Sequence, residues 1–141
     1  MRRFFLLAIA TAVLARGDTA QELIDLFASM ASALSEGNAE GFMRAIDPSM
    51  RGYERLAANI NALATQNALS NSIEIVSQKG DDRVQDVELD WLLEIIGKGE
   101  SHVFVRREVL VKCRLERQKK KWRIVALDPS DFFAPPSSDA H

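Results

Sequence analysis

The sequence predicts an α+β domain in which three N-terminal helices pack on a strongly curved antiparallel sheet. Apolar residues recur at spacings of three and four from 19 to 64, and apolar and polar residues alternate from 84 to 127. The alternating runs are longer than the five or six residues usual for strands, so they must coil or contain bulges. We therefore expect the sheet to wrap around the helices as a cone that encloses a cavity.

The first helix is expected to start at Thr19, because Thr19 and Glu22 have the spacing of a capping box. Its apolar positions fall on one helical face: Leu23, Ile24, Phe27, Met30, Ala31 and Leu34. Gly37 is placed to end this helix, since glycine readily adopts the left-handed conformation found after helix C-termini.

Two further helices are expected before the sheet. Asn38 can cap a short second helix. Asp47-Pro48 ends that helix, because proline disfavours helical backbone at the residue before it. Ser49 is predicted to cap a third helix, whose apolar stripe consists of Met50, Tyr53, Leu56, Ala57, Ile60, Leu63 and Ala64.

Three strands with one apolar face are predicted between 84 and 127, after a first strand at about 69–78. The inward positions of the second and third strands are Val87, Leu89, Trp91, Leu93, Ile95, Val103, Val105, Val109, Val111, Cys113 and Leu115. Successive side chains of a strand point to opposite faces, so this pattern is typical of an antiparallel sheet covered on one side.

The length of the loop around 97–99 sets the register of the second and third strands. A two-residue loop would turn their apolar faces to opposite sides, whereas a three-residue loop keeps them together. In the three-residue register Leu89 lies opposite Arg107. Glu88 lies opposite Glu108, and this pair of like charges counts against the register.

The basic run at 117–121 is interpreted as the solvated tip of the next hairpin. A loop at 117–120 sets Leu115 opposite Trp122. Trp122 is therefore expected on the inner face of the sheet.

Composition and charge exclude several classes of protein. The 141 residues fit one domain, and 47% hydrophobic with 27% charged residues is typical of a soluble globule. The net charge of -2 argues against a nucleic-acid-binding surface. Cys113 is the single cysteine, expected to be a buried, inert thiol. His102 and His141 lack further ligands at metal-binding spacing, so no metal and no cofactor are expected.

Residues 1–17 have the layout of a secretory signal peptide. Arg2 and Arg3 precede an apolar stretch that ends in small residues, with Ala15 as the candidate last residue before cleavage. The apolar part is shorter than the ~20 residues of a membrane-spanning helix. We expect a mature domain at 18–128 and an irregular tail at 129–141.

This layout predicts a protein exported to the periplasm or secreted, with no stable membrane anchor after signal cleavage. General secretion is the favoured route, and the two arginines leave twin-arginine export as an alternative. The remaining alternative is that 1–17 forms a helix of the fold.

Two stretches carry a resemblance to a known superfamily. Residues 34–42 (LSEGNAEGF) are similar to the join between the first two helices of the NTF2-like superfamily, which includes SnoaL-like proteins, ketosteroid isomerases and scytalone dehydratases. Residues 121–127 (KWRIVAL) are similar to its last strand. The resemblance covers about 19–127 and implies the cone fold. It leaves the function open, because the superfamily contains both enzymes and non-catalytic binding modules.

Arg107 interrupts the inward apolar face and is the strongest candidate for a ligand contact. A guanidinium there must find an acid, a carbonyl, water or an anionic ligand. In the functional interpretation Arg107 binds a carboxylate inside the cone. In the structural interpretation a bulge turns it outward, or it pairs with an acid such as Asp47 or Glu54. The other candidate cavity residues, which core packing also explains, are Tyr53, Trp91 and Trp122.

Apolar side chains are also expected among the charges on the outward face of the sheet. They are Leu92, Phe104, Leu110, Val125 and Leu127. Large apolar residues gathered on a sheet indicate a covered surface, so we expect a homodimer through this face. Alternatively, Phe132 and Phe133 of the tail fold back over it.

The sequence therefore favours an exported, non-catalytic module that binds a small apolar or anionic ligand, or a partner protein, in or around the cone. The resemblance implies that catalytic members use an acid or base and hydrogen-bond donors inside the cone. Most acids of the predicted strands fall on the outward face, so no such set can be assigned. The alternative is a SnoaL-like isomerase, dehydratase or cyclase that acts on a small organic substrate through Tyr53, Asp47 or Arg107.

Overall fold

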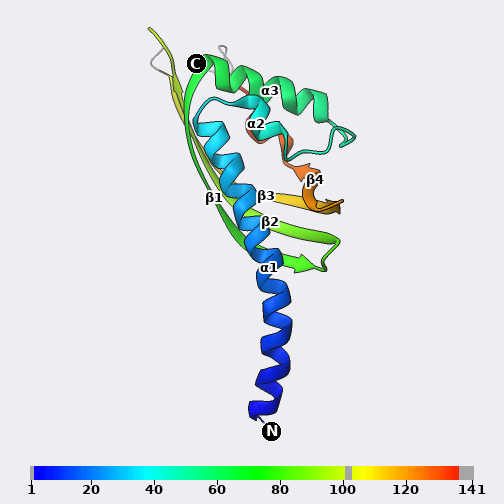
Figure 1. Cartoon of the computed structure of the whole chain (residues 1–141). Helices are drawn as coiled ribbons and strands as arrows, with labels where there is room; N and C mark the ends of the chain where they lie inside the picture. The colour runs from blue at the N-terminus through cyan, green and yellow to red at the C-terminus, as the bar shows by residue number, and fades with distance from the viewer. Residues whose placement is uncertain (1, 101–102, 137–141) are drawn as a thin grey trace.

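The computed structural model describes residues 2–100 and 103–136, with side chains from residue 18 onward. The elements are α1 (Arg2–Ser35), α2 (Ala39–Met43), α3 (Tyr53–Gln66), β1 (Asn67–Gly80), β2 (Val84–Gly97), β3 (Phe104–Gln118), β4 (Lys121–Asp128) and the 3-10 helix η1 (Ser130–Phe133). The strands form one antiparallel sheet in the order β1-β2-β3-β4. The sheet curves around α1, whose N-terminal half extends beyond it (Figure 1). The predicted class, three helices before a curved antiparallel sheet, is confirmed.

The join between α1 and α2 follows the sequence prediction. Gly37 has φ 74° and ends α1. Its N–H donates to Leu34 O (3.1 Å), and the N–H of Asn38 donates to Ala33 O (2.8 Å), the two bonds of a Schellman motif. The side chain of Asn38 then accepts from the N–H of Gly41 (2.9 Å) and caps α2. These bonds fix the angle between α1 and α2.

The third helix starts later than predicted, at Tyr53 instead of after Ser49. The carboxylate of Asp47 accepts from both the backbone N–H and the hydroxyl of Ser49, each at 2.8 Å. This Asx-type turn competes with helix formation. Gly52 then precedes α3 with φ 83°, a left-handed conformation that separates the turn from the helix.

The predicted register of β2 and β3 is wrong, although the predicted inward faces are right except at Val103, which precedes β3 and is 41% exposed. Leu93, not Leu89, lies opposite Arg107. Ile96 pairs with Phe104, so the connection between the two strands is longer than three residues. The longer connection shifts the observed pairing relative to the predicted one. The shift by an even number of positions keeps both apolar sets on one side. His102, predicted to follow this loop, lies outside the described residues.

The observed register pairs opposite charges across the outward face. Glu88 lies opposite Lys112, Asp86 opposite Arg114, and Glu94 opposite Arg106. Asp86 and Arg114 form the closest of these ion pairs, at 2.9 Å. Cross-strand pairs of opposite charge stabilise a sheet, and the like-charge pair of the predicted register is absent.

The hairpin between β3 and β4 is also tighter than predicted. Gln118 pairs with Lys121, and Lys119 has φ 61°, so the turn has two residues. A bulge between Arg114 and Leu115 then shifts the phase of β4. As a result Leu127, predicted on the outward face, is 9% exposed and belongs to the core.

Part of the segment predicted to be irregular is folded. Residues 130–133 form η1, in which Phe132 and Phe133 are 4% and 0% exposed. Both rings pack edge-to-face or tilted against Trp91 on the concave side of the sheet. They do not cover the outward face, the alternative that the sequence suggested. Apolar burial explains why a proline-flanked segment is ordered.

Cys113 lies in this core, 4% exposed, and burial raises the pKa of its thiol to about 12. The thiolate is the reactive form, so we expect native protein at pH 8 to resist modification by Ellman's reagent. One thiol per chain should react once denaturant unfolds the protein. Modification of the native protein at the rate of a free cysteine would contradict this packing.

Candidate functional site

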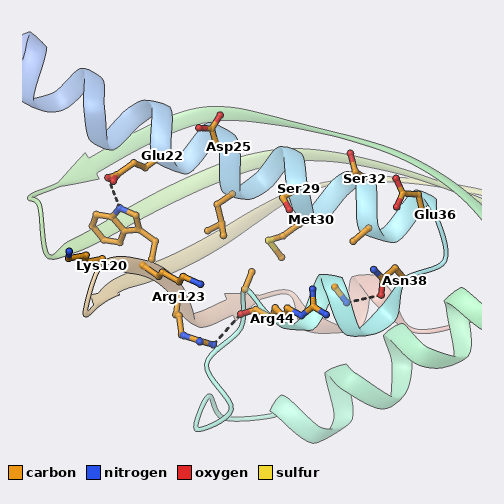
Figure 2. A pocket seen from close by; sticks show the side chains of 16 residues that line it. Glu22, Asp25, Ser29, Met30, Ser32, Glu36, Asn38, Arg44, Lys120 and Arg123 are labelled. Atoms are coloured by element: carbon orange, nitrogen blue, oxygen red, sulfur yellow. Dashed lines mark hydrogen bonds between the residues drawn. The ribbon is translucent and has the colours of Figure 1, made fainter.

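A groove of about 680 Å³ lies between α1, α2 and the β3–β4 hairpin. Figure 2 shows α1 along one side, with β4 and α2 opposite. The apolar floor consists of side chains that are also part of the core: Met30, Ala33, Ala45 and Trp122. Ser29, Ser32 and Asn38 add polar groups at the rim. An apolar floor with a few polar groups at its edge suits a small amphipathic molecule.

The two walls of the groove carry opposite charges. The α1 side presents Glu22, Asp25 and Glu36, and the opposite side presents Arg44, Lys120, Lys121 and Arg123. None of the ion pairs among the described residues involves Lys120, Lys121 or Arg123. Arg123 Nη1 donates to the carbonyl of Arg44 (3.1 Å), which joins β4 to the end of α2. The basic wall can therefore receive an anion.

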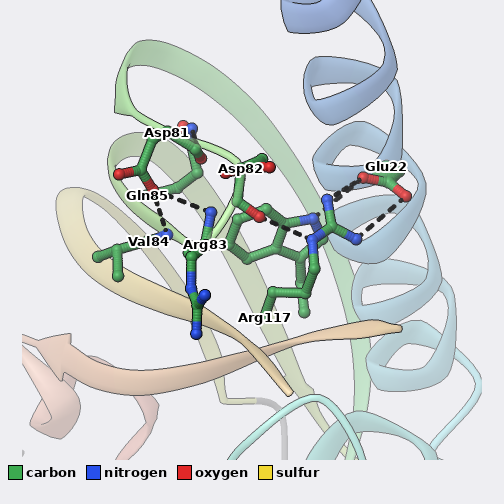
Figure 3. A network of polar contacts seen from close by, with 8 residues as sticks. Glu22, Asp81, Asp82, Arg83, Val84, Gln85 and Arg117 are labelled. Carbon is green, nitrogen blue, oxygen red and sulfur yellow. Dashed lines mark hydrogen bonds and ion pairs between the residues drawn. The ribbon is translucent and has the colours of Figure 1, made fainter. Parts of the chain in front are cut away.

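The acidic wall is partly neutralised by Arg117. Arg117 Nη2 lies 2.8 Å from Glu22 Oε1, and its Nε donates to the carbonyl of Asp82 (2.7 Å) in the β1–β2 turn. Its guanidinium also lies over the Trp122 ring, 4.5 Å from the centroid. Figure 3 shows how this one side chain connects α1 with the turn before β2.

Glu22 accepts a second bond, from Trp122 Nε1 (3.1 Å). The hydrogen bond from Arg117, followed by that from Trp122, lowers the pKa of Glu22 below its usual range. The predicted helix start and capping box at Thr19 are wrong, because α1 runs from Arg2 through Thr19 without a break. Glu22 instead joins α1 to the sheet. This contact fixes the orientation of the indole that forms part of the groove floor.

Glu22→Gln is expected to lower the free energy of unfolding by up to about 1 kcal/mol, since the ion pair is partly exposed. The lowered pKa of Glu22 means that this contribution is complete above the usual glutamate pKa of about 4.3. It disappears as the pH falls through the lower folded-state value. Denaturant melts at pH 7 and pH 3 should thus show a larger difference between wild type and variant at pH 7 than at pH 3. Glu36→Gln, on the same helix, is the control and should match wild type at both pH values.

The structure places the four predicted cavity residues in different surroundings. Trp122 lines the groove, and Trp91 is 0% exposed in the core. The Trp91 indole donates to Asn71 Oδ1 (3.0 Å), so its polar group is satisfied inside the fold. Tyr53 is partly buried against the core at the start of α3. Arg107, Tyr53 and Trp91 are not among the groove residues.

Arg107 remains on the inward face but finds neither partner considered in the structural interpretation. Its Nη1 donates to the carbonyls of Phe132 (2.7 Å) and Ala134 (2.6 Å). No bulge interrupts the β2–β3 pairing around it, and neither Asp47 nor Glu54 pairs with it. Backbone carbonyls were one of the possible partners for a guanidinium in this position.

Asp47, the acid named for a catalytic role, lies in the turn before α3. Hydrogen bonds from Gln118 and from Ser49 lower its pKa. A carboxylate held in its ionised form in this way is a weak general base. Within the described part of the chain, no group of three or more His, Cys, Asp or Glu residues could hold a metal ion.

The outward face of the sheet exposes part of the apolar set predicted there. Phe104 and Leu110 are 58% and 47% exposed, and Leu92 and Val125 are partly buried. Ile96, directly across from Phe104, is 46% exposed and extends this surface. Ile96 shares the outward face with Leu92 through the alternation of β2, but the sequence prediction did not include it.

The groove itself was missed by sequence reasoning. Two residues of its basic wall, Lys120 and Lys121, come from the run at 117–121, which alone is typical of a solvated turn. What makes it a site is the position of α1 opposite the hairpin, a tertiary relation that no local pattern encodes. In the sequence, the one indication of a groove here was that an aromatic residue, Trp122, directly follows the lysines.

Comparison with protein-family models gave no match, and neither did comparison with curated protein sequences. Solved structures do match in fold. A conserved protein from Planctomyces limnophilus is 6% identical over 79% of this chain and 94% of its own, with a TM-score of 0.72.

An NTF-2 like protein of unknown function from Shewanella oneidensis is 11% identical over 77% of this chain and 96% of its own, with a TM-score of 0.64. A putative scytalone dehydratase from Novosphingobium aromaticivorans is 8% identical over 82% and 85%, with a TM-score of 0.70. Identities this low establish the fold and not the activity. The chain therefore has the NTF2-like α+β cone fold that its sequence resemblance implied.

Proposed function

We propose that this protein is an exported, non-catalytic module that binds a small amphipathic anion in the groove between α1 and the β3–β4 hairpin. The observation that carries the proposal is a buried apolar floor beside three cations of the basic wall, Lys120, Lys121 and Arg123, that form no ion pair among the described residues. An acyl or aryl chain would contact Met30 and Trp122. Its carboxylate would lie near Lys120, Lys121 and Arg123.

The interior of the cone supports binding over catalysis. Side chains fill it, and no Asp, Glu, His, Lys or Tyr among the described residues is buried. Acid–base catalysis needs a titratable group within hydrogen-bond reach of the reacting atoms, held at a suitable pKa. Arg107, Cys113 and Arg117 lie on the inward face of β3, and none of them is suited to proton abstraction at neutral pH.

Calorimetry with octanoate and octylammonium tests the groove, because the two probes share a chain and differ in charge. We expect the wild type to bind octanoate, and the Lys120→Gln/Lys121→Gln variant to bind it about 5- to 20-fold more weakly. Lys112→Gln, on the outward face of β3, is the matched control and should bind as wild type does. Equal affinity for both probes, or no effect of the double variant, would reject the proposal.

A second variant blocks the groove without removing charge. Ser29 is exposed on α1 at the rim, so Ser29→Trp should fill the space above Met30 and leave the core intact. We expect loss of octanoate binding with an unchanged thermal midpoint. Retained binding would place the ligand elsewhere.

We propose export on the basis of residues 1–17, whose order of charged, apolar and small residues is that of a signal peptide. No helix within the described residues is long and apolar enough to span a membrane. Expression with the native N-terminus in a bacterial host, followed by cell fractionation and intact-mass measurement, tests the proposal. Recovery of shortened protein outside the cytoplasm is expected, and full-length protein confined to the cytoplasm would reject it.

We also propose that the outward face forms a homodimer. The exposed apolar residues of this face lie among charges of both signs, with Arg106 within 3.9 Å of both Glu94 and Glu108. A surface that carries both signs around an apolar centre can be complementary to a second copy of itself. The variant that tests this is given in the Discussion.

An enzyme of SnoaL-like type is the second candidate, favoured by the similarity in fold to a putative scytalone dehydratase. Tyr53, Asp47 or Arg107 would then have to act on a substrate in the cone. Assays of dehydration and double-bond isomerisation on small hydroxy-carbonyl compounds test it. Turnover that Tyr53→Phe or Asp47→Asn abolishes would favour the enzyme over the binding module.

A further inference from the structure

The C-terminal segment inserts two aromatic rings into the concave side of the sheet. Phe133 is fully buried, with its ring centroid 4.9 Å from Trp91 and 5.5 Å from Phe42. Phe132 is 4% exposed and lies 6.2 Å from Trp91. The segment thus occupies space inside the cone that the four-stranded sheet, α2 and α3 surround.

Arg107 holds the backbone of the same segment. A single nitrogen, Nη1, donates to two carbonyl oxygens that are two residues apart, Phe132 O and Ala134 O. Burial lowers the pKa of Arg107, and the nearby charge of Asp131 opposes this. No carboxylate among the described residues forms an ion pair with it. This partly buried cation is thus compensated mainly by two neutral carbonyls, which are weaker partners than a carboxylate.

We infer that residues 130–134 act as an internal ligand, and that the space they occupy is a latent binding site for an aromatic carboxylate. The phenyl rings of the segment show what the apolar part of the site accepts. The two carbonyl oxygens on Arg107 take the place of the two oxygens of a carboxylate. The free ligand would gain a charge-assisted bond that the segment cannot make.

An attached segment competes with any free ligand at a high effective concentration. The wild type is therefore expected to bind such a ligand weakly, because only the small fraction of molecules with the segment displaced is competent. Removing the two rings should expose the site. This site differs from the groove, since Arg107 and Trp91 do not line the groove.

The two tryptophans make the test specific, because Trp91 reports on the interior of the cone and Trp122 on the groove. The full chain carrying Phe132→Ala/Phe133→Ala is titrated with 3-phenylpropionate while the two indole N–H resonances are followed by NMR. We expect the Trp91 resonance to move, with an affinity at least about 10-fold higher than that of the wild type. Adding Arg107→Met should remove the binding, and 3-phenylpropanol should bind about 10-fold more weakly than the acid.

The single variant Phe132→Ala guards against loss of folding, since its ring is the less buried of the two. In the wild type, high concentrations of 3-phenylpropionate should accelerate amide hydrogen exchange at 130–134. A folded variant whose Trp91 resonance does not respond would overturn the inference. Failure of both alanine variants to fold would overturn it as well, because the segment would then be permanent core and not a displaceable ligand.

Discussion

Trp91→Ala is expected to lower the free energy of unfolding by about 4 kcal/mol, the range measured when large buried aromatic residues are truncated. Trp91 is fully buried, and its ring contacts Phe42, Phe132 and Phe133. Its removal leaves a cavity among rings that belong to α2 and η1. Since a domain of this size is stable by roughly 5–15 kcal/mol, the variant should lose between about a quarter and four-fifths of its free energy of unfolding.

Trp91→Phe tests the contribution of the indole hydrogen bond separately from the contribution of ring packing. It keeps most of the packing but leaves Asn71 Oδ1 without the indole donor. Asn71 also donates to Ala31 O and Ser35 Oγ on α1, so the indole supports the contact between helix and sheet. We expect a loss of about 1–2 kcal/mol. Urea melts of both variants measure these values, and a loss below about 1 kcal/mol for Trp91→Ala would contradict the packed interior.

Phe104→Asp should shift the proposed homodimer toward monomer, with dissociation at least about 100-fold more favourable. Phe104 is 58% exposed in the single chain and lies directly opposite Ile96 across β2 and β3. A buried apolar anchor replaced by a carboxylate loses its hydrophobic contribution and adds a charge without a partner. The fold of the chain itself should be unaffected, because the side chain contributes little to the core.

Analytical ultracentrifugation over a concentration series measures this equilibrium. Ile24→Asp is the matched control, since Ile24 is also exposed, at 49%, but lies on α1 rather than on the outward face of the sheet. It should leave the dimer intact. A wild type that sediments as a monomer at all concentrations would reject the proposed homodimer.

The parts of the fold that follow local rules were predictable from the sequence. Gly37 marks the C-terminus of α1 because it adopts a left-handed backbone conformation that other residues rarely adopt. Asn38 marks the N-terminus of α2 because its side chain accepts the capping hydrogen bond. The inward and outward faces of β2 and β3 were also predictable, because the alternation of side chains survives any even shift in register.

The register was not predictable from loop length alone. The Glu88–Glu108 conflict was the available signal, and the observed Glu88–Lys112 pairing resolves it. The bulge that turns Leu127 inward, and the left-handed Lys119, depend on how the sheet closes against the helices. Tertiary packing determines such features, and the residue types leucine and lysine do not predict them.

The site was harder to predict than the fold, because it too depends on tertiary packing. Arg107 was correctly singled out as an exception on the inward face, but its partners come from a segment predicted to be irregular. Two adjacent phenylalanines after a strand were the signal that this segment would be buried. The groove needs α1 and the hairpin to be opposite each other, which follows only from the complete fold.

The most direct test of the groove as the binding site uses the two indole resonances of the wild-type protein during an octanoate titration. Trp122 lines the groove and Trp91 lies in the filled interior. The account predicts a saturable shift of the Trp122 resonance with no change at Trp91. A shift of Trp91 alone, or no shift of either resonance, would contradict it.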